Sequence, residues 1–153
     1  MAKYKVSKRI EVAGCHCLNL PYESKCVNPH GHNWIILVNI EGEQLDPQGM
    51  LIDFTHIKRV VNRLDHANVN EVVGPKINPT AENIAEWIAN QVQETISTKW
   101  HEYAIQEARA NEPHGSVSEI EEDAHEIEQF WSIPQVSLIT VQEREGNVAC
   151  YTP

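Results

Sequence analysis

The sequence contains no long apolar run. No window approaches the roughly eighteen uninterrupted apolar residues that a membrane-spanning helix needs. The start of the chain, MAKYKVSKRI, is basic but is not followed by the apolar stretch of an export signal. These absences predict a cytoplasmic protein with no membrane partner.

Positive charge is also scarce. The 12 Lys and Arg residues stand against 22 Asp and Glu residues, which gives a formal net charge of −10. Because affinity for nucleic acids comes largely from Lys and Arg along a basic face, DNA and RNA are poor candidate partners. Residues 99–134 hold nine acids and two bases, so −7 of the total charge lies in this one segment.

Cysteine is too sparse to suggest a disulfide framework in a chain without an export signal. The four thiols are better interpreted as packing, metal-ligand or reactive groups: Cys15, Cys17, Cys26 and Cys150. With 153 residues, 41% of them hydrophobic and 22% charged, we expect one globular domain over residues 1–153.

The apolar pattern predicts strands near both ends of the chain. Residues 34–40 are apolar at most odd and even positions alike, which predicts a strand covered on both faces. Residues 4–12 are expected to pair with it. Residues 137–151 predict a closing hairpin whose turn is supplied by Gly146 and Asn147.

Helices are predicted between these strands. Asp53 is a candidate N-cap for a helix that ends near Asp65. Residues 78–80, Asn-Pro-Thr, announce a second helix. Residues 118–121 have the pattern of a capping box and predict a third, amphipathic helix inside the acidic segment. The predicted order is ββααββ with a helical insertion at about 99–134, which is an α+β arrangement.

The stretch KCVNPHGHNW, residues 25–34, places a cysteine and two histidines just before a predicted strand. On an extended segment, residues two apart project to the same side, so His30 and His32 present both imidazoles to one ion. Gly31 between them leaves room for a close approach. A hairpin-like return of the chain brings His16 beside them. Three neutral imidazoles around zinc leave one position open, as in catalytic zinc sites.

Two other interpretations of this stretch stay open. Neighbouring histidines in a loop are often only solvated or hydrogen-bonded. A closed structural zinc site in a small binding module is the other interpretation, although Cys15-His16-Cys17 lacks the usual gap between paired ligands. Its ligands would be Cys15, Cys17, Cys26 and His30.

Taken together, these motifs resemble the 6-pyruvoyltetrahydropterin synthase superfamily over nearly the whole chain. The resemblance is carried by His16, Cys26-x-x-x-His30-Gly31-His32, Leu64-Asp65-His66 followed by Asn70, Pro79-Thr80-Ala81-Glu82-Asn83, and Glu143. The three residues between Cys26 and His30 resemble the 6-carboxytetrahydropterin synthase branch of queuosine and 7-deazapurine synthesis. The pyruvoyl-forming branch has a longer gap there.

The resemblance implies the tunnelling fold, or T-fold, in which ββααββ subunits place two helices on one face of an antiparallel sheet. It also implies a homo-oligomer, commonly a hexamer of two stacked trimers with substrate sites at the subunit interfaces. The implied activity is a zinc-dependent lyase that converts 7,8-dihydroneopterin triphosphate to 6-carboxy-5,6,7,8-tetrahydropterin, acetaldehyde and triphosphate. Formation of 6-pyruvoyltetrahydropterin on the same scaffold and a non-catalytic zinc-binding module are the alternatives.

The resemblance also implies roles for single residues at the metal centre. His16, His30 and His32 are the expected Zn²⁺ ligands, and the ion stabilises developing enolate-like charge on the substrate oxygens. Cys26 is the expected catalytic base, which requires a thiol pKa lowered by nearby positive charge.

A second proton carrier is implied on the opposite side of the substrate. It is His66, whose tautomer Asp65 fixes. Glu143 shares strand parity with inward-facing positions, so its carboxylate needs a partner, and the family's glutamate accepts two hydrogen bonds from the pterin. Thr80 and Glu82 match further substrate contacts of the family, although helix capping is an adequate and slightly better explanation of both.

Two departures from the family pattern leave questions open. Cys15 and Cys17 flank His16 where the family has small apolar residues, so either thiol is a competitor for the metal. The segment 99–134 is longer than the family's usual connection, and covering the oligomer, binding a partner and decorating the surface are all open roles for it. We also expect a basic patch for the anionic substrate, with Lys25 and the lysines and arginine of residues 3–9 as candidates.

Overall fold

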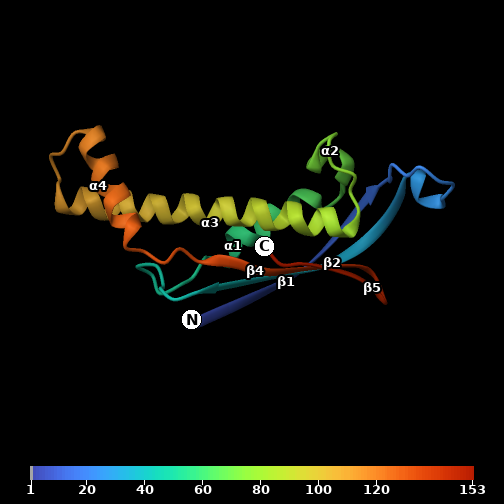
Figure 1. Ribbon diagram of the computed structural model, residues 1–153, viewed down its shortest axis with the longest axis horizontal. Helices are drawn as coiled ribbons and strands as arrows, with labels where there is room; N and C mark the ends of the chain where they lie inside the picture. The colour runs from blue at the N-terminus through green and yellow to red at the C-terminus, as the bar shows by residue number, and fades with distance from the viewer. Residues whose placement is uncertain (1) are drawn as a thin grey trace.

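The computed structural model describes residues 2–153, and its centre is a five-stranded sheet in the order β3-β1-β2-β4-β5 (Figure 1). β1 and β2 are the longest strands and pair antiparallel along their whole length. The strands are β1 (Tyr4–His16), β2 (His30–Gly42), β3 (Ala67–Asn68), β4 (Gln135–Arg144) and β5 (Asn147–Tyr151). The expectation of a wholly antiparallel sheet is wrong, because the short β3 runs parallel to the end of β1.

The helices lie on one side of the sheet (Figure 1). They are α1 (Phe54–Val61), α2 (Val69–Val73), α3 (Ala81–Asn111) and α4 (Val117–Gln129), with two single 3₁₀ turns, η1 (Lys25–Val27) and η2 (Asn62–Leu64). Both β3 and α2 are additional to the predicted order. Within residues 2–153, no helix has the length and apolar content to cross a membrane.

The predicted start of α1 is confirmed. The Asp53 side chain accepts a hydrogen bond from the Thr55 amide at 2.8 Å, which caps the helix. The apolar positions at i, i+3 and i+4, Ile57, Val60 and Val61, are all buried against the sheet. η2 then continues the chain to Leu64, so the helical stretch ends next to Asp65, as its pattern indicated.

α3 is longer than the sequence suggested. Its buried face begins with an apolar stripe from Ile84 to Ile96, and the same helix continues into the acidic segment to Asn111. There it carries buried Trp100, Ala104 and Ala108. The first part of the 99–134 insertion is therefore an extension of α3, and Figure 1 shows α4 crossing the far end of this helix.

α4 begins two residues earlier than predicted. The sequence contains two overlapping Ser-x-x-Glu patterns, and the capping box uses Ser116, not Ser118. The Ser116 amide donates to the Glu119 carboxylate at 2.7 Å, and the Glu119 amide donates back to Ser116 Oγ. With this start, Ile120 and Ala124 pack on Ala104 and Ala108 in a small second core.

The prediction that β2 is covered on both faces is wrong for the single chain. The alternate residues Trp34, Ile36, Val38 and Ile40 are at most 1% exposed beneath the helices. Their neighbours on the other face, such as Leu37, are only partly buried. An apolar run on both parities indicates that both faces avoid water, but it does not require the same chain to cover them.

The β4–β5 hairpin brings one acidic residue to the helix side of the sheet. Its turn is Glu145-Gly146, with Gly146 at φ 82°, and Asn147 already belongs to β5, so the predicted placement of Asn147 in the turn is wrong. The register shifts between Gln142 and Arg144, which leaves Glu143 in a β-bulge. Bulges re-aim side chains and are common beside functional sites.

Candidate metal centre and substrate pocket

The β1–β2 pair brings His16 beside His30 and His32, which lie two residues apart on β2. His16 is the partner of His30 in the ladder, and His32 is the partner of Gly14. The ring centroid of His16 lies 4.5 Å from that of His30 and 5.2 Å from that of His32. The ring centroids of His30 and His32 are 5.0 Å apart. The expected hairpin-like return is therefore present, and the three imidazoles share one face of the sheet.

Backbone carbonyls fix the orientation of two of these rings. His16 Nδ1 lies 2.8 Å from the Pro79 carbonyl oxygen, and His30 Nδ1 lies 2.8 Å from the carbonyl oxygen of Asn28. Because a carbonyl only accepts, Nδ1 must carry the proton in both rings. The Nε2 lone pairs are then free to bind a metal ion, as in metal sites whose ligand histidines donate the other ring N–H to a backbone carbonyl.

The bulged Glu143 completes this cluster. Its Oε1 lies 2.9 Å from His32 Nε2 and 3.3 Å from His16 Nε2. Neither contact meets hydrogen-bond geometry, so both Nε2 atoms are buried without a partner. The potential ligand atoms of His16, His30, His32 and Glu143 all lie within 4.8 Å of one another, and no other such group occurs among residues 2–153.

The donor set fits zinc. Three imidazoles and one carboxylate are ordinary Zn²⁺ ligands, and two of the nitrogens are buried polar atoms that a metal ion would satisfy. No cysteine belongs to the group among the described residues, so the structure does not form the closed Cys/His site that the sequence left open.

Burial favours the neutral form of two of these histidines. Desolvation lowers the pKa of His16 below its ordinary value of 6.5, and the positive charge on neighbouring imidazoles lowers it further, against the opposing effects of the Pro79 carbonyl and Glu143. Desolvation likewise lowers the pKa of His32. Metal binding requires the neutral imidazole, so these shifts favour it.

A hollow of about 400 Å³ adjoins the cluster. It is lined by Glu143, Thr80 and Glu82, the three residues that the sequence resemblance assigned to substrate binding, together with Leu18 and part of the β4–β5 hairpin. Thr80 also caps α3 by accepting a hydrogen bond from the Asn83 amide at 3.3 Å. Capping and lining the hollow are therefore compatible for this residue.

Cys26 lies in η1, beside the chain that follows β1. Ser24 Oγ accepts a hydrogen bond from the Cys26 amide at 3.2 Å and caps this single turn. The Cys26 carbonyl oxygen accepts a hydrogen bond from the Leu18 amide at 2.8 Å. Cys26 is partly buried. The second of these bonds holds its backbone against Leu18, which lies two residues after His16.

Asp65 and His66 lie on the other edge of β1. Asp65 Oδ1 is 3.1 Å from His66 Nδ1 and accepts a hydrogen bond from the Ala13 amide at 2.9 Å. The Ala13 hydrogen bond, followed by the hydrogen bond and charge of His66, lowers the pKa of Asp65 below its ordinary value. His66 has φ 53° and a side chain that is 84% exposed. The expected pair is formed and is fixed to β1.

The sequence profile described as 6-pyruvoyl tetrahydropterin synthase matches residues 5–123, which is most of the chain. The chain belongs to the 6-pyruvoyltetrahydropterin synthase family. A Rickettsia felis relative named 6-carboxy-5,6,7,8-tetrahydropterin synthase is 31% identical over 110 residues, which cover 58% of this chain and 79% of that protein. A Dictyostelium discoideum relative named 6-pyruvoyl tetrahydrobiopterin synthase is 34% identical over 94 residues, which cover 57% of this chain and 70% of that protein.

Solved structures confirm the fold of the family. The Caenorhabditis elegans 6-pyruvoyl tetrahydropterin synthase superposes with a TM-score of 0.60 at 20% identity and covers 98% of this chain and 95% of its own. The α+β T-fold expected from the sequence is thus confirmed. The resemblance to the 6-carboxytetrahydropterin synthase branch is likewise supported by relatives that carry this name.

Gly14 permits a close approach between β1 and the segment that follows α1. This contact is separate from the room that Gly31 was expected to leave between the two imidazoles. A Cβ atom at Gly14 would lie 2.8 Å from the Leu64 carbonyl oxygen, whereas at Gly31 its nearest neighbour would be the Gly14 oxygen at 3.4 Å. The sequence gives no signal for this contact, because it joins β1 to a segment fifty residues away.

The expected basic patch is not formed by the N-terminal cations within one chain. Lys5 pairs with Glu41 at 2.7 Å, and Arg9 lies 3.9 Å from Glu11. At about 3.3 Å per residue along a strand, Arg9 is about 23 Å and Lys5 about 36 Å from His16. Lys25 in η1 is the one of these candidates that lies next to the proposed catalytic thiol in the sequence.

Proposed function

We propose that this protein is a zinc-dependent 6-carboxy-5,6,7,8-tetrahydropterin synthase that acts on 7,8-dihydroneopterin triphosphate in queuosine and 7-deazapurine synthesis. The observation that carries the proposal is the pair of buried, unpartnered Nε2 atoms of His16 and His32 beside a hollow lined by Glu143. The three-residue spacing between Cys26 and His30 and the names of the relatives favour the carboxy product over the pyruvoyl product.

His16, His30 and His32 hold the ion in this proposal. When bound, Zn²⁺ supplies an electrophile for the hydroxyl oxygens of the substrate side chain. The backbone carbonyls of Pro79 and Asn28 keep the rings in the tautomer that presents Nε2. Three protein ligands leave a position for substrate, which is why Glu143 is assigned to the pterin and not to the ion.

Glu143 orients the pterin ring. Its carboxylate lies between the imidazole cluster and the hollow. A pterin ring bound to Glu143 in the hollow would therefore have its own side chain directed at the imidazole cluster. Paired hydrogen bonds from the amino group and a ring nitrogen of the pterin would satisfy this partly buried charge. Thr80 and Glu82 line the same hollow at the start of α3 and complete the pterin contacts.

The two proposed proton carriers approach β1 from opposite edges. Backbone groups of successive residues in a strand point to opposite edges, so an odd-numbered and an even-numbered residue of β1 face different edges. Asp65 and His66 bond to Ala13 on one edge, and Cys26 bonds to Leu18 on the other. This arrangement supports proton removal by the Cys26 thiolate and proton delivery by His66 on opposite sides of a substrate held at His16.

We further propose that the active protein is a homo-oligomer, of which a hexamer of two trimers is the form implied by the family. The partly exposed apolar face of β2 supports this, because residues such as Leu37 would be covered by another copy. The pterin substrate is the small-molecule partner.

The proposal is tested by incubating zinc-loaded protein with 7,8-dihydroneopterin triphosphate and identifying the pterin product by mass spectrometry. We expect 6-carboxytetrahydropterin. Cys26→Ala should lower turnover by about 10²–10⁴-fold, as expected for loss of a general base, and should leave the zinc content unchanged. Cys150→Ala, which removes an exposed thiol in β5, is the matched control and should retain activity.

Other outcomes separate the alternatives. A pyruvoyl product would assign the protein to the sister reaction. Loss of zinc in Cys26→Ala would make this thiol a metal ligand and favour a structural site. Zinc binding by the wild-type protein without turnover would refute the synthase and favour a binding module.

A further inference from the structure

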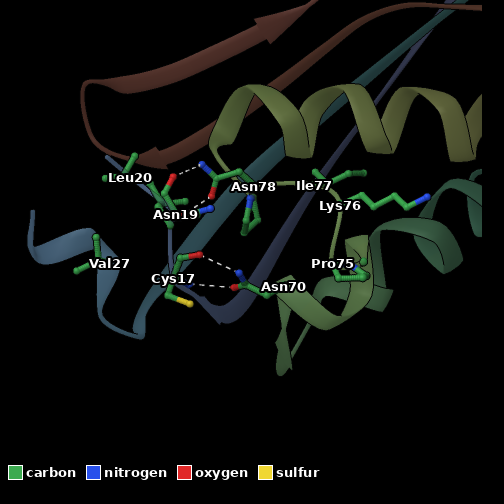
Figure 2. Close-up of a pocket in the computed structure, with 12 residues that line it drawn as sticks. Cys17, Asn19, Leu20, Val27, Asn70, Pro75, Lys76, Ile77 and Asn78 are labelled. Atoms are coloured by element: carbon green, nitrogen blue, oxygen red, sulfur yellow. Dashed lines mark hydrogen bonds between the residues drawn. The ribbon is translucent and has the colours of Figure 1, made fainter. Parts of the chain in front are cut away.

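The chain beyond the metal-binding residue His16 is held by side-chain amides that replace a neighbouring strand (Figure 2). Asn70 accepts from the Cys17 amide at 2.9 Å and donates to the Cys17 carbonyl at 2.8 Å. Asn78 does the same for Asn19, at 2.8 Å and 3.0 Å. Each asparagine thus satisfies both backbone groups of one residue, as a paired strand does.

Asn78 links the backbone after His16 to the segment that contacts the His16 imidazole. From His16 the chain runs three residues to Asn19, whose backbone is bonded to the side chain of Asn78. The next residue, Pro79, places its carbonyl oxygen 2.8 Å from His16 Nδ1. The imidazole and the backbone of His16 are therefore fixed by the same short segment, residues 78–79.

That segment is itself anchored to the start of α3. The Asn78 carbonyl oxygen accepts hydrogen bonds from the Thr80 amide and from Asn83 Nδ2, both at 2.8 Å. Pro79 is buried, and its ring restricts φ. Few rotations remain by which the Pro79 carbonyl can change its direction while the Asn78 side chain is bonded.

We propose that Asn78 is a positioning residue for the metal ligand His16, acting through the Pro79 carbonyl. The inference rests on the metal centre of the proposed function and assigns a role to a residue that touches neither metal nor substrate. Without the amide of Asn78, the segment 78–79 loses its tie to Asn19 and the Pro79 carbonyl moves relative to His16 Nδ1. The Nε2 lone pair then no longer has one fixed direction, which weakens metal binding.

If Asn78 only stabilised the fold, Asn78→Ala would lower the free energy of unfolding. The Asn78–Asn19 bonds lie in an exposed part of the molecule, so water replaces them when the side chain is removed. Global stability should consequently change little in Asn78→Ala, and a change in the metal centre would report position and not unfolding.

The test measures zinc affinity by competition with a chromophoric chelator and the visible spectrum of the Co²⁺-substituted protein. Asn78→Ala should bind zinc about tenfold more weakly, the lower end of the range for changes in groups that orient metal ligands, and should show altered Co²⁺ bands. Asn78→Asp keeps the acceptor for the Asn19 amide and should restore part of the affinity. Asn90→Ala, at an exposed position on α3, is the control and should match the wild type.

Zinc affinity within twofold of the wild type, with an unchanged Co²⁺ spectrum, would overturn the inference while leaving the metal centre intact. Failure of the wild type to bind zinc would overturn the metal centre and this inference together. If Asn78→Ala does not fold, Asn83→Ala decides: it removes one of the two donors to the Asn78 carbonyl and should weaken zinc binding in the same direction.

Discussion

Gly14 is the position where the structure predicts the sharpest effect of adding a single methyl group. An added Cβ would lie 2.8 Å from the Leu64 oxygen, 3.0 Å from the Ala67 oxygen and 3.1 Å from the Trp34 ring. Two of these neighbours are backbone atoms that flank Asp65 and cannot rotate away. Gly14→Ala must therefore push the segment 64–67 off β1 and disturb the 2.9 Å bond between Asp65 and the Ala13 amide.

The expected cost follows from this overlap. Overpacking by one methyl group costs about 1–3 kcal/mol. For a chain of this length, about 2 kcal/mol lowers the melting temperature by about 4–8 °C. Differential scanning calorimetry at fixed zinc concentration measures the shift. Catalytic turnover should fall as well, because the displaced segment carries the proposed proton carrier His66.

Gly31→Ala is the matched control in the adjacent strand. Its Cβ would meet one atom within 4 Å, the Gly14 oxygen at 3.4 Å, and Gly31 does not have a positive φ. Replacing such a glycine restricts the unfolded chain and stabilises by about 0.4–1 kcal/mol where the backbone is compatible. Equal destabilisation by the two substitutions, or an unchanged melting temperature in Gly14→Ala, would refute the reasoning.

Two further predictions concern other parts of the molecule. The pKa of Asp65 in the folded protein is lowered from 3.8, so the unfolded state binds more protons. The ionised carboxylate therefore stabilises the fold above pH 3.8, and this stabilisation is lost as the pH falls through the folded pKa. Urea unfolding should thus show a smaller difference between the wild type and Asp65→Asn at pH about 3 than near neutrality, and a constant difference would contradict this. Trp131→Ala removes a ring 5.4 Å from that of Trp100 and should cost about 1–3 kcal/mol in thermal unfolding. Its zinc affinity should stay that of the wild type, and a large loss would show that α4 contributes to the metal centre.

The grouping of the metal-site histidines was predictable because it depends on local periodicity. His30 and His32 are two residues apart on a strand, and the hairpin that pairs β1 with β2 requires no information from the rest of the chain. Glu143 was predicted to face inward by the same period. It does so, in a bulge that the alternation does not reveal.

The contacts that orient the site were not predictable from the sequence. The Pro79 carbonyl and the Gly14 contact each join segments about fifty or more residues apart, and a backbone oxygen leaves no trace in residue identity. The start of α4 was misplaced for a different reason: Ser116 and Ser118 both satisfy the capping pattern, and tertiary packing of Ile120 favours the first. Local signals with two solutions are resolved only by the fold.

The groups bonded to the outer edge of β1 also determine where another strand can pair with the sheet. From Ala13 to Asn19 the outer edge is occupied by Asp65, β3, Asn70 and Asn78 in turn. Along Tyr4–Val12, none of the described strands pairs with that edge. Unpaired strand edges template pairing with other chains. Any strand that a second copy adds to β1 is therefore confined to the half remote from the histidines, so assembly through this edge leaves the metal cluster accessible.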